Sequence, residues 1–263
     1  MKKLLICITA AAFSFTVQAQ QTKQSAKQAR KAEKRARINA MIRAEEEGVI
    51  AYRKHFAFGL KLTSDGYGVS FEKGYAKSVK RATLFQLEIT ERKHQKEDKQ
   101  SNPNTPSAPL IYGKINYFYP IKLGVQKQFL LANKSNKNGV SISANLGGGI
   151  SLGLLRAYEV EVDKNGERTF IRYDSEDSLL FRNGPYYGGP TLGKGWNHMK
   201  ITPGLYVKPA VRFDYGRYND LVAAIEVGVT AEYYSKKIPQ MLDNKENSFF
   251  FGAYFTILFG KRK

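Results

Sequence analysis

Hydrophobic and polar residues alternate with period two through most of the chain after about residue 55. The clearest run ends the chain, where the odd positions are Phe249, Phe251, Ala253, Phe255, Ile257 and Phe259. The even positions of that run include Gly252, Tyr254 and Thr256. Because successive side chains of a strand point to opposite faces, the run predicts a strand with one greasy face and one small or polar face.

The chain contains eight such runs, at 55–63, 67–75, 85–89, 116–126, 140–152, 205–213, 221–233 and 249–259. The segments between them are short near 76–80, 134–139 and 216–220, and long near 93–109, 163–200 and 236–247. Transmembrane barrels have short turns on one side and long loops on the other. The pattern predicts an all-β fold, an eight-stranded antiparallel transmembrane β-barrel with both termini on the short-turn side, and Ser64–Gly66 as one short turn on the opposite side.

A soluble lipocalin-like barrel is the competing fold. Such a barrel buries its bulkier face inside and shows polar residues to water. Here the bulky apolar residues, such as Phe251 and Phe255, lie on the face opposite to the charges, and Glu226 and Glu232 lie on the inward face of their own run. The sequence therefore favours lipid outside and a polar lumen inside.

The N-terminus predicts an exported protein. Lys2 and Lys3 precede an apolar core that runs from Leu4 to about Val17, and cleavage is expected after Ala19. We divide the chain into a signal peptide at 1–19, a basic periplasmic arm at 20–50 and an outer-membrane barrel at 51–263. Cys7, the only cysteine, lies inside the signal. No small residue precedes it, which excludes a lipid anchor. Because the mature chain would then contain no cysteine, structural disulfides and cysteine-based metal sites are excluded as well.

The arm is rich in Lys, Arg, Ala and Gln, with Glu45–Glu47 near its end. This composition predicts a short helical or disordered segment, and the alternative is a tether that docks on a periplasmic partner. The formal net charge of the chain is +19. An exported protein does not normally meet nucleic acid, so we expect outer-membrane lipids, including lipopolysaccharide, as the counter-charges, and a protein partner in the periplasm or outer membrane.

Charged residues of both signs occupy the positions of the runs whose side chains are expected to point into the barrel. They are Lys61, Glu72, Glu88, Lys122, Lys208, Arg212, Glu226 and Glu232. An eight-stranded barrel has an interior that side chains roughly fill, and buried charges need partners. We interpret the set as a polar network that closes the lumen. The alternative is an ion path or a catalytic carboxylate pair such as Glu226 with Glu232.

Catalytic groupings are sparse. His198 lies close enough in sequence to Ser175 or Ser178 to permit a triad, whereas His94 lies in a charged loop and reads as a surface histidine. The segment Gly188–Gly195 nearly matches a P-loop, but Gly195 stands where Ser or Thr would bind magnesium. We expect no enzymatic activity, no cofactor and no metal, and a lipid A-modifying enzyme is the least favoured alternative.

The longest loop, 163–200, is the candidate binding surface. Tyr186, Tyr187 and Trp196 either stack on a glycan or, as we favour, pack within their own loop. Lys164–Gly166 is expected to turn a hairpin between 158–162 and 169–173.

Three segments carry a family resemblance: Val17–Gln20, Tyr112–Gly124 and Phe255–Gly260. They resemble small outer-membrane β-barrel proteins of the Bacteroidetes. The resemblance implies location and fold, and it carries over no catalytic residue. We expect a non-enzymatic outer-membrane barrel that serves as a structural or accessory subunit through its periplasmic arm and external loops. A surface binding or adhesion protein that uses the 163–200 loop is the alternative.

Overall fold

The computed structural model describes residues 27–33, 35–36, 39–40, 53–101, 108–134, 139–174, 176–191, 193–216 and 221–263. The chain divides into two units, 1–51 and 52–263, and the described residues of the first unit are helical. The predicted signal at 1–19 lies outside the described residues, as does much of the predicted arm at 20–50. Of the helices that the structure describes, none has the length and apolar character to cross a membrane.

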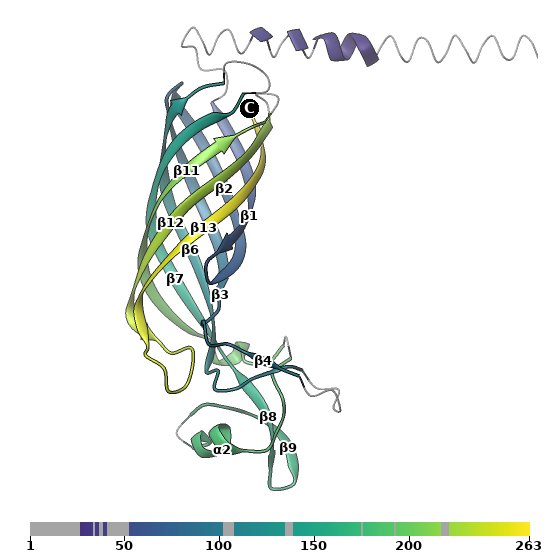
Figure 1. The fold of residues 1–263 in the computed structure, drawn as a ribbon, viewed down its shortest axis with the longest axis vertical. Helices are drawn as coiled ribbons and strands as arrows, with labels where there is room; N and C mark the ends of the chain where they lie inside the picture. Colours follow the sequence, from purple (N-terminus) through teal and green to yellow (C-terminus); the bar gives the residue numbers. More distant parts are fainter. Residues whose placement is uncertain are drawn as a thin grey trace, which may run out of the picture. The chain divides into compact units, whose positions relative to one another are not determined.

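Eight antiparallel strands of the second unit close into a barrel (Figure 1). They are β1 (Lys54–Thr63), β2 (Gly66–Ser78), β3 (Arg81–Arg92), β6 (Asn116–Ala132), β7 (Ser141–Ala157), β11 (Lys200–Asp214), β12 (Leu221–Ile238) and β13 (Asn247–Arg262). Each strand pairs with its neighbours in this order, and β1 closes the ring on β13, from His55 opposite Arg262 to Thr63 opposite Tyr254. The predicted all-β, eight-stranded antiparallel barrel is confirmed.

The connections alternate as predicted. One end of the barrel, the termini end, carries the start of β1, the end of β13 and the short link at 79–80. The other end, the loop end, carries the turn at 64–65 and the long connections 93–115 and 158–199. β11 begins at Lys200, earlier than the run at 205 predicts. The residues before Leu205 pair with β7, but Pro203 and Gly204 interrupt the alternation there and hide the start of the strand in the sequence.

The barrel wall is apolar outside and polar inside. Leu60, Leu205 and Phe251 face outward and are 52%, 63% and 64% exposed. The residues that follow Leu60 and Leu205, which are Lys61 and Tyr206, face inward and are buried. The wall therefore exposes much more contiguous apolar surface than a water-soluble protein normally does.

Additional elements lie at the loop end (Figure 1). They are β4 (Lys99–Gln100), β5 (Leu110–Ile111), β8 (Glu159–Lys164), β9 (Glu167–Arg172), α2 (Ser178–Asn183), β10 (Tyr186–Gly188) and η1 (Trp196–His198). β10, β8 and β9 form a separate three-stranded sheet. The predicted hairpin is confirmed: Asn165 and Gly166 both have positive φ, at 60° and 85°, as a tight two-residue hairpin turn requires.

The loops have a hydrophobic core of their own. Its buried members are Ile111, Tyr158, Val160, Val162, Ile171, Phe181 and Met241. Tyr158 is its most deeply buried aromatic residue, and the Tyr158 hydroxyl accepts a hydrogen bond of 2.7 Å from the Ile111 backbone N–H. We call β4, β5, β8, β9, β10 and α2 the loop module. Its packing gives it a defined structure rather than that of an irregular loop.

Candidate functional site: a charged interior and a structured loop module

The inward faces of the strands bring all eight charged residues named from the sequence into the barrel interior. Each of them, Lys61, Glu72, Glu88, Lys122, Lys208, Arg212, Glu226 and Glu232, is 3% exposed or less. A buried charge without a partner costs several kcal/mol, so the contacts of these groups decide what the interior does.

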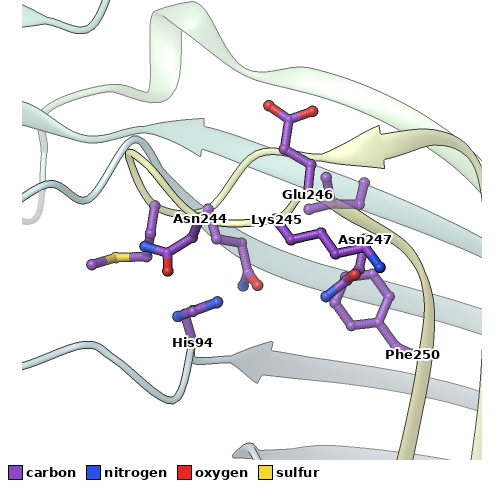
Figure 2. A pocket seen from close by; sticks show the side chains of 9 residues that line it. His94, Asn244, Lys245, Glu246, Asn247 and Phe250 are labelled. Carbon is purple, nitrogen blue, oxygen red and sulfur yellow. The ribbon is translucent and has the colours of Figure 1, made fainter.

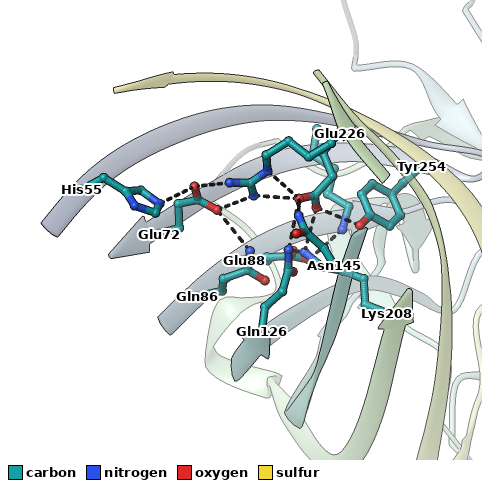
Figure 3. Close-up of polar contacts among 11 residues, drawn as sticks. His55, Glu72, Gln86, Glu88, Gln126, Asn145, Lys208, Glu226 and Tyr254 are labelled. Atoms are coloured by element: carbon teal, nitrogen blue, oxygen red, sulfur yellow. Dashed lines mark hydrogen bonds and ion pairs between the residues drawn. The ribbon is translucent and has the colours of Figure 1, made fainter. Parts of the chain in front are cut away.

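Arg212 is the centre of the network, and Figure 3 labels the two carboxylates that it joins, Glu72 and Glu226. Its Nη1 and Nη2 donate to the two carboxylate oxygens of Glu72 at 2.8 and 2.7 Å. Its Nη2 and Nε also donate to Oε2 of Glu226, at 2.6 and 3.0 Å. One planar guanidinium from β11 thus joins carboxylates from β2 and β12, a use of the fork geometry that Lys does not offer.

Glu226 accepts bonds from several strands. Gln126, Asn145 and Tyr254 donate to it at 3.1, 2.8 and 2.8 Å, in addition to Arg212. Its two oxygens therefore have a full set of partners and no access to a substrate. Glu226 and Glu232 bind different cations, so the structure gives no support to an acid–base pair between them.

Glu88 anchors a second cluster. Lys61 lies 2.7 Å from Glu88, and Lys208 contacts the same carboxylate from the other side. The Lys61 ammonium also lies 3.9 Å from the centre of the Tyr254 ring. These contacts tie β1, β3, β11 and β13 together across the lumen.

A third cluster surrounds Glu232 nearer the loop end. Lys122 lies 2.6 Å from Glu232, Arg92 lies 3.2 Å from it, and the Tyr234 hydroxyl donates to it at 2.7 Å. Sequence reasoning missed Arg92. The alternation could have identified it, because Glu88, Thr90 and Arg92 are alternate residues of β3 and therefore point to the same inward face.

The termini end has its own polar closure. His55 Nε2 lies 3.3 Å from Glu72. Asp214 accepts from Lys134 at 3.3 Å and contacts Arg262 as well. The ion pairs therefore extend from the termini end to Arg92 near the loop end. This arrangement suits a lumen that blocks ions rather than one that conducts them.

The three loop aromatics named from the sequence each contact a neighbouring group. The Tyr186 hydroxyl donates to the Phe181 carbonyl at 2.6 Å, and that of Tyr187 donates to Asp163 at 3.2 Å. Trp196 stacks on Tyr119, with ring centres 6.0 Å apart and planes 13° apart. Arg156 of β7 also lies over the Trp196 ring, 4.9 Å from its centre, so Trp196 contacts two barrel strands.

The candidate catalytic residues are not assembled. Ser178 begins α2 and His198 ends η1, and within the described part of the chain no hydrogen bond joins the two. Ser175 lies outside the described residues. The described ranges also hold no group of three or more His, Cys, Asp or Glu side chains suited to a metal.

His94 lines a small polar pocket at the loop end (Figure 2), beside the β12–β13 connection and Phe250. The imidazole Nδ1 of His94 accepts a hydrogen bond of 3.2 Å from the Lys96 backbone N–H, and the His94 backbone N–H donates to the Glu97 carboxylate at 2.9 Å. Burial lowers the pKa of the imidazole below its ordinary value of 6.5; Lys96 and Lys114 lower it further, while Glu97 opposes them. The lowered pKa and the accepting Nδ1 both favour neutral His94.

Acidification is expected to loosen the turn at His94. Folding lowers the pKa of His94, so the folded segment binds fewer protons than the unfolded one as the pH falls through 6.5. The stability of the segment therefore rises with pH and is lost as the pH falls. Amide hydrogen exchange at Lys96, corrected for the intrinsic rate, should accelerate between about pH 7.5 and about pH 5.5. His94→Gln should abolish this pH dependence, and an unchanged dependence in that variant would refute the assignment.

Comparison with solved structures finds matches of low identity and low TM-score. Neisserial surface protein A is 12% identical, over 80% of this chain and 94% of that one, with a TM-score of 0.33. The N-terminal β-barrel domain of OprF from Pseudomonas aeruginosa is 8% identical, over 79% and 96%, with a TM-score of 0.34. Ail, the attachment invasion locus protein of Yersinia pestis, is 10% identical, over 80% and 96%, with a TM-score of 0.34.

No protein-family model matches the chain, and no curated protein matches it. Likenesses of this strength assign neither a function nor a partner. The fold itself is established by the closed ring of eight antiparallel strands.

Proposed function

We propose that this chain is an outer-membrane β-barrel that is exported by its signal at 1–19. The observation that carries the proposal is the inversion of the wall, with exposed aliphatic and aromatic residues outside and ion pairs inside. Aromatic residues also gather near both ends of the outer wall, with Tyr117, Tyr119 and Trp196 towards the loops and Tyr75 and Phe85 towards the termini. Girdles of this kind mark the two membrane interfaces of such barrels.

The barrel acts through its surfaces rather than through its lumen. The interior carboxylates are bound to Arg and Lys side chains, which supports a barrel without conduction and without acid–base chemistry. A closed barrel of this kind serves as a structural or accessory subunit of an outer-membrane assembly. The basic arm at 20–50 is its periplasmic contact, and its described helical residues 27–33 are exposed. The resemblance to Bacteroidetes barrels supports the outer-membrane location of this barrel.

A surface binding role for the 163–200 loop is the second candidate. The loop module has a buried core, and Arg168 and Lys194 cover its aromatic residues at 4.2 and 4.4 Å from the ring centres. A preformed cationic surface favours lipopolysaccharide phosphates or anionic glycans as ligands. A lipid A-modifying activity gains no support, because Ser178 and His198 are not hydrogen-bonded to each other in the described part of the chain.

Affinity capture from gently solubilised outer membranes tests the two roles. The mature chain is compared with a variant that lacks residues 20–48, and with one in which Arg168 and Lys194 are changed to Gln. The accessory role predicts specific partners that disappear only with the arm. Capture of no stable partner by any form, or partners retained without the arm, would contradict it. Partners or glycans lost only with the loop substitutions would establish the binding role.

A further inference from the structure

Three basic residues line a groove on the barrel wall at the termini end. The groove encloses about 540 Å³ including its open side, and Lys77, Arg81 and Lys127 line it together with Thr83 and Phe129. The three bases come from β2, β3 and β6, three strands that lie side by side in the barrel. They are exposed, unlike the charges of the interior network.

The strand register places the groove on the outer wall. Phe129, 42% exposed, lies opposite Arg81, and Lys127 lies opposite Thr83. Because residues opposite each other on paired strands share a face, Arg81 and Lys127 face outward with Phe129. β2 has a register shift between Ala76 and Ser78, which leaves Lys77 as an extra, unpaired residue. A bulge of this kind redirects a side chain, and here Lys77 lines the same groove.

The groove has positive charge without a counter-charge. Among the described residues, no carboxylate lies within ion-pair distance of Lys77, Arg81 or Lys127, and the Lys127 ammonium donates only to the Thr83 hydroxyl, at 3.0 Å. The bases of the interior network, by contrast, have acidic partners, as Lys61 and Arg212 do. Three like charges on one surface repel one another unless an anion lies between them. A phosphate group suits this arrangement, since Arg binds phosphate through two parallel N–H bonds.

An apolar stripe continues from the groove towards the middle of the barrel. The next outward pair on β3 and β6 is Phe85 opposite Val125, which are 52% and 40% exposed, and Leu87 opposite Leu123 follows. A lipid suits this surface, because its anionic headgroup would lie against the bases at the end of the strands and its acyl chain along the apolar stripe. A free phosphate ion would use the bases alone, and a protein partner would not need a stripe that faces lipid.

We propose that this groove binds an anionic phospholipid of the leaflet at the termini end. Lys77, Arg81 and Lys127 hold the headgroup phosphate, and Phe85 and Val125 contact an acyl chain. The inference rests on the proposed membrane insertion. With the loops outside the cell, the termini end faces the periplasmic leaflet, so the ligand is a phospholipid rather than lipopolysaccharide.

The test uses the full mature chain in nanodiscs of phosphatidylcholine that contain a minor fraction of phosphatidylglycerol, with retained lipids identified by native mass spectrometry. The wild-type barrel is expected to retain phosphatidylglycerol in preference to phosphatidylcholine. Lys77→Gln/Arg81→Gln/Lys127→Gln should lower this preference about tenfold or more, because each base near a headgroup contributes a several-fold factor. Lys77→Arg/Lys127→Arg keeps the charges and should retain it.

The matched control removes the same charge at the same end, outside the groove: Lys54→Gln/Lys261→Gln/Lys263→Gln. An equal loss of preference in this control, or no loss in the groove variant, would overturn the proposal. Displacement of the lipid by inorganic phosphate at millimolar concentration would reduce the groove to an ion site and overturn it as well. Insertion into the nanodisc is scored first, so that failure to insert counts against the proposed function and not against the groove.

Discussion

Arg212→Met is expected to destabilise the barrel by about 3–5 kcal/mol, the cost of removing one partner from a buried ion pair. Arg212 is buried and joins Glu72 and Glu226, which lie on different strands. Methionine fills much of the volume of arginine but leaves two carboxylates without their shared cation. Urea unfolding of the barrel in lipid vesicles, followed by tryptophan fluorescence, measures the loss.

Lys200→Met is the matched control, because Lys200 is an exposed base on the same strand. Its change should stay within about 0.5 kcal/mol. Adding Glu72→Gln and Glu226→Gln to Arg212→Met should recover part of the lost stability, because neutral side chains no longer need a buried cation. A loss for Arg212→Met no larger than for Lys200→Met would contradict the network as the closure of the lumen.

Leu60→Arg is the second large effect. Leu60 faces outward near the middle of β1, between Val69 on β2 and Ile257 on β13. A charge on the lipid face costs about 2–4 kcal/mol at the bilayer midplane and about 0–1 near the interfaces. We therefore expect a loss of about 2–4 kcal/mol, measured by the same unfolding experiment.

Leu131→Arg provides the comparison, because Leu131 is 65% exposed but lies at the termini end of β6. Its cost should be about 1 kcal/mol or less. On a wall that faces water, an arginine at an exposed leucine would be neutral or favourable at both positions. Equal and small effects at Leu60 and Leu131 would therefore count against a lipid-facing wall.

The strand faces were predictable because side-chain direction in a strand depends only on parity. The inward positions of Glu88, Lys122 and Arg212 follow from their neighbours in sequence. Which acid meets which base was not predictable, because Arg212 reaches Glu72 across 140 positions of sequence. Such pairs depend on strand tilt and stagger, which the alternation of residues does not encode.

The loop module shows the limit of local signals more clearly. The Asn165–Gly166 turn was predictable, since positive φ at both residues suits this pair. The burial of Tyr158 and the stacking of Trp196 on Tyr119 were not, because both join segments that are distant in sequence. The β-bulge at Lys77 was not predictable either, because one extra residue in an alternating run leaves no distinct mark in the sequence.

The central claim is that the outer wall faces lipid and the inner wall a packed polar interior. Single cysteines along β13 in a Cys7→Ser background test it most directly, since Cys7 is the only native cysteine. In bilayers, cysteines at Phe251, Ala253 and Phe255 should react with a lipid-soluble maleimide and not with a charged water-soluble one. Those at Tyr254 and Thr256 should react with neither while the barrel is folded. Rapid reaction of the outward positions with the water-soluble reagent, or no alternation along the strand, would contradict the account.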